Sequence, residues 1–153
     1  MVRSGPDPAQ LRQFIAQLRP GAVVRLHQPV ADKVKRHVLI SAAAERSLAF
    51  IINTLPSPFI LAREELKRRQ VLMLKADHSF MHHDSYVACH DTVRLPAARD
   101  FAGLLWAGKA QILGNLHASL YEAIAAAANG SPLIADRDVR LIVAGFSRTQ
   151  GTR

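Results

Sequence analysis

Residues 71–95 hold most of the side chains in this sequence that could carry out chemistry. Four of the seven histidines and the only cysteine lie there, namely His78, His82, His83, His90 and Cys89. A polar turn from Asp77 to Ser85 separates two apolar runs, 71–74 and 86–88, a pattern that predicts strand, short helical turn, strand. Such side chains could bind a transition metal, supply a nucleophile or transfer protons.

Metal binding and cysteine chemistry are the two weaker interpretations of this segment. His78 and His82 are four residues apart, but the sequence has no Cys-x-x-Cys pair and no His-Glu-x-x-His motif. We therefore expect no metal and no cofactor, and keep a metal-dependent enzyme as a third alternative. Side chains alternate along a strand, so Cys89 should share a face with Val87 and lie in the core.

Acid–base chemistry on RNA is a further interpretation. A metal-free ribonuclease needs a base for the 2′-hydroxyl proton, an acid for the leaving oxygen and a cation at the phosphate. Histidine suits both proton transfers because its reference pKa is about 6.5, and arginine binds oxyanions through two parallel hydrogen bonds. The residues that could supply these groups are Arg36, His37, Thr54, His78 and His82.

A purely structural interpretation of the polar turn stays open beside the chemical ones. In it His78, Ser79 and Ser85 cap the turn, while His83 and Asp84 tie it to neighbouring strands. Serine and aspartate commonly make such hydrogen bonds to nearby backbone.

Charge favours a polyanionic partner. Twenty Lys and Arg residues against twelve Asp and Glu give a formal net charge of +8, which suits RNA, DNA or an acidic protein. A single cysteine cannot form an intrachain disulfide, which fits a cytoplasmic location. The longest apolar stretch, Ile112–Ala128, is too short and too polar to span a membrane, so we expect no membrane association.

The elements that must position these residues begin with a helix and three strands. Asp7-Pro8 starts a helix that Pro20-Gly21 ends. Strands are predicted over 22–26, 36–41 and 47–54, close enough in sequence for a small antiparallel sheet. Between the first two strands, the loop 27–35 carries Lys33 and Lys35, which we expect to contact substrate.

Helices are predicted for most of the remaining chain. Ser57-Pro58 starts one that continues to about Gln70. The C-terminal part contains one around Phe101–Leu105, a longer one through Ile112–Ile124 that Asn129-Gly130 ends, and a last one from Asp136.

The strand order and the turn carry a resemblance to a known family. The segments Pro20-Gly21-Ala22-Val23-Val24, 35–41 and 49–54 resemble the first three strands of the PemK/MazF toxin superfamily, with Arg36 opening the second strand and Thr54 closing the third. The segment 77–87 is similar to a turn found in PemK-like, SH3-like barrel proteins. The resemblance covers roughly residues 20–95.

This resemblance implies a small SH3-like antiparallel β-barrel and, by analogy with characterised members, mRNA cleavage controlled by an antitoxin. By position Arg36 resembles the catalytic arginine and Thr54 the third-strand threonine of those toxins. We expect Arg36 to hold the phosphate, Thr54 to orient it, and His37 or His78 to transfer the proton. Contacts to substrate are expected from Lys33, Lys35, His82 and Ser85.

The sequence therefore predicts an α+β protein: an N-terminal helix and SH3-like barrel over residues 1–95 and a helical extension over 96–153. The leading function is a metal-independent endoribonuclease of the toxin–antitoxin type, with RNA and a cognate antitoxin as partners. The alternative is the same barrel as a non-catalytic module that binds nucleic acid or protein. The C-terminal helices could complete the core, form a homodimer or bind the antitoxin.

Overall fold

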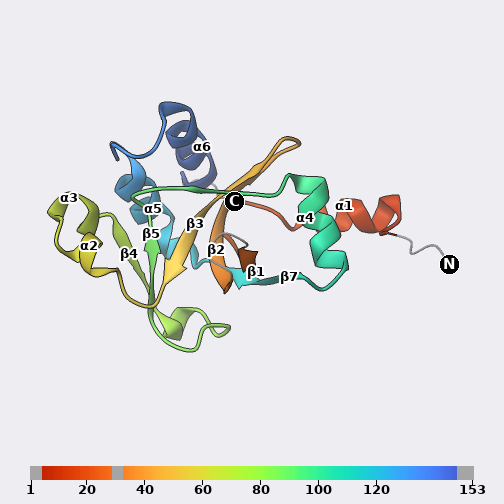
Figure 1. The fold of residues 1–153 in the computed structure, drawn as a ribbon, viewed down its shortest axis with the longest axis horizontal. Helices are drawn as coiled ribbons and strands as arrows, with labels where there is room; N and C mark the ends of the chain where they lie inside the picture. Colours follow the sequence, from red (N-terminus) through yellow and green to blue (C-terminus); the bar gives the residue numbers. More distant parts are fainter. Residues whose placement is uncertain (1–4, 29–32, 148–153) are drawn as a thin grey trace.

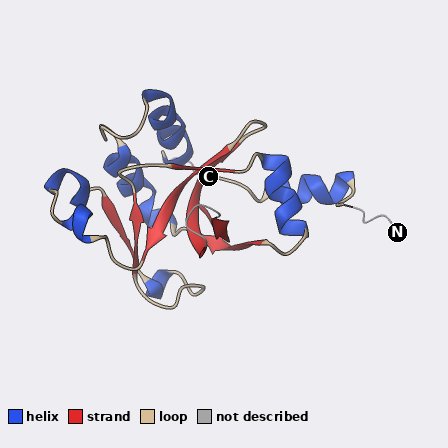
Figure 2. Ribbon diagram, viewed as in Figure 1, coloured by secondary structure: helices blue, strands red, loops and turns tan. Residues whose placement is uncertain are grey.

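The protein is built on one antiparallel sheet with helices on both of its faces (Figure 1, Figure 2). The computed structural model describes residues 5–28 and 33–147, and within them the α+β class is confirmed. The strands are β1 (Ala22–Gln28), β2 (Lys33–Ala42), β3 (Ser47–Asn53), β4 (Gln70–Met73), β5 (Ser85–Ala88), β6 (Val93–Leu95) and β7 (Ala110–Asn115). The helices are α1 (Pro8–Ala16), α2 (Pro58–Leu61), α3 (Glu64–Lys67), α4 (Ala98–Trp106), α5 (Tyr121–Ala128) and α6 (Asp136–Phe146).

The strand order shows that the sheet is open. Its hydrogen-bonded path runs β4-β5-β3-β2-β1-β7, with the short β6 paired to β3 beside that path. All the pairings are antiparallel. In the part of the chain that the structure describes, β4 and β7 stay at opposite edges, so the sheet is not closed into the barrel that the sequence predicts.

Alternation along the central strands divides the core between two faces of the sheet. On the first, called face A, Val38 and Ile40 pack with Phe50, Ile124 of α5 and Phe146 of α6. The opposite side is called face B, and its buried residues include Val24, Leu39, Ala49, Leu95 and, from α4, Phe101. Neighbouring residues of β2 therefore lie on opposite sides of the sheet.

Local sequence signals explain where several elements begin and end. The Asp7 carboxylate accepts a hydrogen bond from the Gln10 backbone N–H at 2.9 Å, and the Gln10 side chain accepts one from the Asp7 N–H, which confirms the predicted start of α1. The end of α5 at Ala128 is also confirmed, with Gly130 following at a φ of +82°.

The helix predicted from Ser57 to Gln70 is wrong in its length. Ser57 caps the N-terminus of α2 as expected, by accepting a hydrogen bond from the Ile60 N–H at 3.3 Å. The chain then leaves helical geometry at Arg63, where φ is −121° and ψ is 107°, and α3 begins at Glu64. Two single-turn helices result, because the chain bends back to place β4 against β5.

The helix predicted through Ile112–Ile124 is wrong over its first half. Residues 110–115 form β7, which pairs with β1 from Leu26↔Ala110 to Ala22↔Asn115. Helix α5 begins only at Tyr121, after a short 3-10 turn over Ala118–Leu120. The spacing of Ile112, Leu113 and Leu116 fits a helix, but the free hydrogen-bonding edge of β1 stabilises an extended chain instead.

The histidine-rich turn is fixed against β7. Between β4 and β5 the chain forms a 3-10 turn over Lys75–Asp77, at the start of the predicted turn Asp77–Ser85, and then a coil that places Phe80 on Gly114. A Cβ atom on residue 114 would lie 2.5 Å from the Phe80 ring, so only glycine permits this contact. The turn thus covers one end of face A.

Two expectations concern the whole chain: that it has no membrane-spanning segment, and that it divides into two parts. In the described ranges, none of the helices is both long and apolar enough to cross a membrane. The division into residues 1–95 and 96–153 stays a prediction, although β7 from the second part pairs with β1 from the first.

Candidate active site

Arg36 lies in β2, and its side chain is on face A of the sheet. His37 pairs with Ile51, so the next positions, Arg36 and Ile52, are neighbours across the two strands. Arg36 is partly buried, and its Nε atom is buried without a hydrogen-bond partner among the described residues. A buried guanidinium N–H that lacks an acceptor is costly, so this group would gain from binding an oxyanion.

Thr54, His83 and Ser85 are connected to one another at the end of β3 and the start of β5. The Nε2 atom of His83 is 3.5 Å from the Thr54 hydroxyl oxygen. His83 Nδ1 donates to the carbonyl oxygen of Asp84 at 3.0 Å and is 3.2 Å from the Ser85 hydroxyl. Because a carbonyl oxygen can only accept, the proton is on Nδ1 and Nε2 keeps its lone pair toward Thr54.

Arg36 lies toward the same end of the sheet as this group. Ile52 pairs with Val87 and Asn53 with Tyr86, so Thr54 and Ser85 follow at the same end of the sheet. The last pair of the β2–β3 register at this end is His37↔Ile51, and Arg36 is the next residue of β2 in that direction. The residues Arg36, Thr54, His83 and Ser85 are here called the face A cluster.

The chemistry available to the face A cluster is proton transfer beside an anion-binding group. An imidazole whose Nδ1 is oriented by a backbone carbonyl presents Nε2 as a base, the arrangement expected of a general base. His83 and Thr54 are exposed, so a substrate can reach them, whereas Ser85 is buried. Arg36 supplies the positive charge.

His37 does not join this cluster. It follows Arg36 in β2 and therefore lies on face B, where its side chain is completely buried. Burial, with a smaller effect from the Lys35 charge, lowers the pKa of His37 to about 4. The structure thus separates two residues that the sequence placed in one catalytic group.

His78 is held by hydrogen bonds on both ring nitrogens. Its Nδ1 donates to the Leu74 carbonyl oxygen at 2.6 Å, and its Nε2 accepts from the His117 backbone N–H at 2.9 Å. The side chain is 1% exposed. These contacts match the structural interpretation of the turn and leave no ring nitrogen for a substrate.

The predicted substrate contacts are divided between the two faces. Ser85 belongs to the face A cluster, and His82 is exposed on the same turn. Lys33 and Lys35 alternate with Val34 and share the His37 side of β2. Residues 29–32 of the predicted basic loop lie outside the described residues.

His83 is the residue whose role the sequence did not indicate. From the sequence we expected His83 only to tie the turn to neighbouring strands, because four histidines share the segment and their spacing does not distinguish them. The one signal available is spacing: His83 lies two residues before the first residue of β5 whose side chain points inward. That position depends on knowing where β5 begins.

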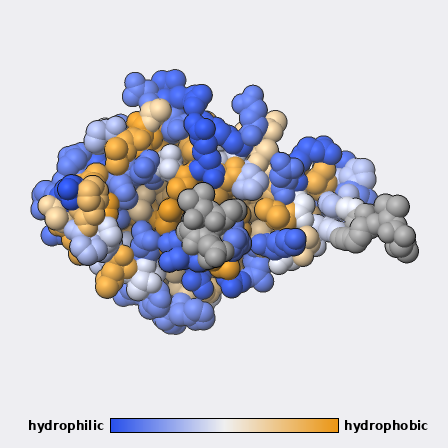
Figure 3. Space-filling model, in the orientation of Figure 1, coloured by the Kyte–Doolittle hydropathy of each residue, from blue (hydrophilic) through white to orange (hydrophobic). Residues whose placement is uncertain are grey.

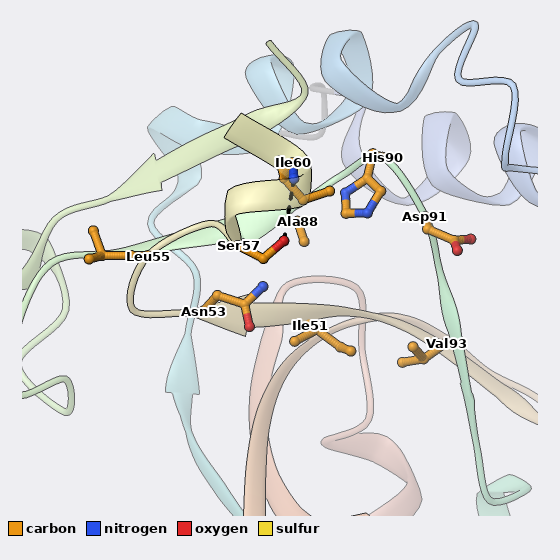
Figure 4. A pocket seen from close by; sticks show the side chains of 9 residues that line it. All are labelled: Ile51, Asn53, Leu55, Ser57, Ile60, Ala88, His90, Asp91 and Val93. Carbon is orange, nitrogen blue, oxygen red and sulfur yellow. Dashed lines mark hydrogen bonds between the residues drawn. The ribbon is translucent and has the colours of Figure 1, made fainter. Parts of the chain in front are cut away.

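A separate cavity of about 340 Å³ lies on the other side of β3, under α2 (Figure 4). Its polar residues are Asn53, Ser57, His90 and Asp91. Ser57 is occupied as the α2 cap, and His90 Nδ1 is 3.0 Å from the Gln70 amide nitrogen. Burial lowers the pKa of His90, while the nearby Asp91 charge opposes that effect.

The metal and cysteine interpretations find no further observation in their favour. Among the residues in the described ranges, no three His, Cys, Asp or Glu side chains gather as metal ligands. Cys89 is fully buried, as the strand alternation predicts, and burial raises its pKa far above the ordinary thiol value. A thiol in this state is a poor nucleophile at neutral pH.

Comparison with known proteins adds no relative from which a role could be transferred. No protein-family model matches the sequence, and a search of curated proteins finds no match. The functional interpretation therefore depends on the geometry of the site and on the resemblance described above.

Proposed function

We propose that this chain is a metal-independent endoribonuclease of the toxin type and that the face A cluster is its active site. The observations that carry the proposal are the unpartnered Arg36 guanidinium Nε and the contact between Thr54 and His83, which lie toward the same end of the sheet. The formal charge of +8 favours an RNA partner, and hydrophilic side chains cover much of the face drawn in Figure 3.

In the proposed reaction the substrate supplies its own nucleophile. Arg36 binds a non-bridging phosphate oxygen, and the Thr54 hydroxyl helps to orient the same group. His83 Nε2 removes the 2′-hydroxyl proton as that oxygen attacks phosphorus, and the resulting imidazolium protonates the leaving 5′-oxygen. The products are a 2′,3′-cyclic phosphate and a free 5′-hydroxyl. His83 thus takes the proton-transfer role that the sequence assigned to His37 or His78.

The family assignment belongs to this proposal. The antiparallel sheet whose β1, β2 and β3 follow one another in space is compatible with an SH3-like PemK/MazF core that has been opened and extended by β7. A cognate antitoxin and a homodimer are the partners that this assignment implies. The positions of Arg36 and Thr54 toward the same end of the sheet support it.

Cleavage of a labelled RNA by purified protein in the presence of EDTA tests the proposal. Wild type should cut the RNA, and Arg36→Ala or His83→Ala should each reduce the rate about 100-fold or more. Arg99→Ala, an exposed change in α4, is the matched control and should cut normally. An intact RNA with wild type, or full activity in His83→Ala, would remove the proposal.

A second candidate function is a non-catalytic nucleic-acid-binding module. The observation that favours it is the state of the two predicted proton carriers, since His37 is buried and His78 has both ring nitrogens bonded. Such a module would bind RNA with a strong dependence on salt and release it uncut. The same assay, followed for binding and for cleavage, separates the two functions.

A further inference from the structure

A cavity of about 300 Å³ lies on face B, beside β2 and α4. That size is at the lower end of small-molecule sites, which span roughly 300–1,000 Å³. Its lining combines apolar side chains with basic ones: Leu26, His27, His37, Arg94, Leu95, Pro96, Leu104 and Lys109. None of these eight residues is acidic.

The buried side of this cavity has a polar group without a partner. Both ring nitrogens of His37 are buried, and neither has a hydrogen-bond partner among the described residues. Most buried polar side chains in proteins have a hydrogen-bond partner, so two buried nitrogens without one call for an explanation. A ligand that brings a donor or an acceptor into the cavity would supply the missing bond.

The protonation of His37 defines what that ligand group must be. With a pKa near 4, the imidazole is neutral at pH 7 and offers one N–H donor and one acceptor nitrogen. The charged side chains that line the cavity, Arg94 and Lys109, are cationic, and Lys35 acts on His37 electrostatically. Arg94 and Lys109 are exposed and can reach solvent.

We propose that this cavity binds a small organic anion with a flat body that carries a hydrogen-bonding edge, of which nucleoside monophosphates are the representative class. The anionic group pairs with Arg94 and Lys109. The flat body packs between Leu95, Pro96 and Leu104, and its polar edge bonds to His37. Inorganic phosphate lacks the flat body and a nucleoside lacks the charge, so neither makes the full set of contacts.

The inference does not depend on the proposed ribonuclease activity. Arg36 and His37 lie on opposite sides of β2, so the face B cavity and the face A cluster can be changed separately. A free mononucleotide and the 5′-phosphorylated end of an RNA strand present the same chemistry to the cavity. The experiment therefore includes both sources.

Calorimetric titration of the full-length chain with UMP and AMP tests the proposal, with uridine and inorganic phosphate as reference ligands. At least one nucleotide should bind, and about tenfold or more tightly than either reference ligand. Arg94→Gln should weaken nucleotide binding by about tenfold, and Leu104→Trp should abolish it by filling the cavity. The exposed α4 residue Arg99, which does not line the cavity, provides the control Arg99→Gln.

Imidazole NMR signals give a readout at the buried residue. Addition of the bound nucleotide should shift the ring resonances of His37 and leave those of His78 in place. A 5′-phosphorylated trinucleotide that binds while free UMP and AMP do not would assign the cavity to an RNA end and keep the proposal. Failure of all of these ligands to bind at millimolar concentration, or unchanged binding in Arg94→Gln, would overturn it.

Discussion

The Nε2 atom of His78 accepts a hydrogen bond from the backbone N–H of His117, 2.9 Å away and 39 residues further along the chain. The same ring donates to the Leu74 carbonyl oxygen, so one buried imidazole joins the end of β4 to the segment that follows β7. His78 thereby positions the turn that carries His83. Its contribution to function is structural support for the candidate site.

The first prediction concerns this support. His78→Leu keeps the volume of the side chain but leaves the His117 N–H without its partner and removes one of the two donors to the Leu74 carbonyl, so the free energy of unfolding should fall by about 1–3 kcal/mol. Urea denaturation measures the change. His82→Ala, on the exposed part of the same turn, should alter stability by less than about 0.5 kcal/mol. Equal stabilities for His78→Leu and wild type would contradict the structural role.

The contact between Phe80 and Gly114 makes the second prediction. Gly114→Ala places a methyl group where the Phe80 ring lies and should destabilise the protein by about 1–3 kcal/mol. Thermal or urea unfolding measures the loss. In a Phe80→Leu background the same change should cost clearly less, because the ring is gone. Gly103→Ala in α4, where nothing lies within 4 Å, should instead stabilise by about 0.5–1 kcal/mol.

Arg69 is the subject of the third prediction. Its buried guanidinium donates to the carbonyl oxygens of Ala127 and Asn129, at 2.7 and 2.8 Å, and to the Glu65 carboxylate. These bonds attach α3 and β4 to the C-terminus of α5, so Arg69→Met should lower stability by about 2–4 kcal/mol. Arg68→Met is the matched control, because that neighbouring side chain is 59% exposed. A loss in Arg69→Met no greater than in the control would be the contrary result.

The fourth prediction is a pH dependence that comes from His37. Its pKa falls from 6.5 when unfolded to about 4 when folded, so the unfolded state binds more protons between these values. The free energy of unfolding should therefore rise with pH across that window, and be about 2–3 kcal/mol lower at pH 4.5 than at pH 7 because of this residue. The charge of Lys35 acts in the same direction as burial.

Urea denaturation at both pH values, on wild type and His37→Gln, isolates the His37 contribution. The variant should lose the part of the pH dependence that His37 causes and keep the part due to His90, whose pKa is also lowered by burial. Identical pH profiles for the two proteins would show that His37 is not the group responsible.

The fifth prediction addresses the Thr54 hydroxyl and depends on the proposed ribonuclease. Thr54→Val removes the group that lies 3.5 Å from His83 Nε2, and should lower the cleavage rate about tenfold or more. Thr54→Ser keeps the hydroxyl and should stay within about threefold of wild type. Initial rates on one labelled RNA give both comparisons. Equal rates for the valine and serine variants would assign Thr54 no part in the reaction.

Local signals were enough to predict several elements of the fold. The Asp7-Pro8 start of α1, the glycine after α5 and the alternation that buries Cys89 each depend on residues close together in sequence. The three predicted strands 22–26, 36–41 and 47–54 correspond to β1, β2 and β3; β1 and β2 extend beyond the predicted bounds, and β3 ends one residue before them. Capping and strand alternation are local effects, so short windows of sequence contain them.

Other features of the fold depend on partners that are distant in sequence. Residues 110–115 have apolar spacing that suits a helix, and they become β7 only because β1 offers its edge nearly ninety positions earlier. In the basic run Lys67-Arg68-Arg69, the Arg69 side chain is only 3% exposed, because two carbonyl groups of the α5 terminus accept its hydrogen bonds. Neither partner is visible in the local sequence.

The candidate site shows the same limit. Arg36 and Thr54 were identified from the sequence, and both lie toward the end of the sheet where β3 meets β5. His37 and His78 were equally plausible by residue type, but one lies on the opposite face and the other has both nitrogens bonded. Residue type indicates which chemistry is possible, whereas the strand face and the hydrogen-bond partners determine which residue is free to perform it.

The adjacency of Arg36 and His37 in β2 also protects the pairing of this strand against error. A shift of β2 by one residue would exchange the two side chains between the faces. The guanidinium would then enter the buried site on face B that the His37 ring occupies, and the Val38 side chain would be turned out of the face A core. Because a buried unpaired charge is so costly, the misaligned strand would be rejected during folding. Arg36 and His37, whose side chains lie on opposite faces of β2, therefore also favour the native register of the sheet.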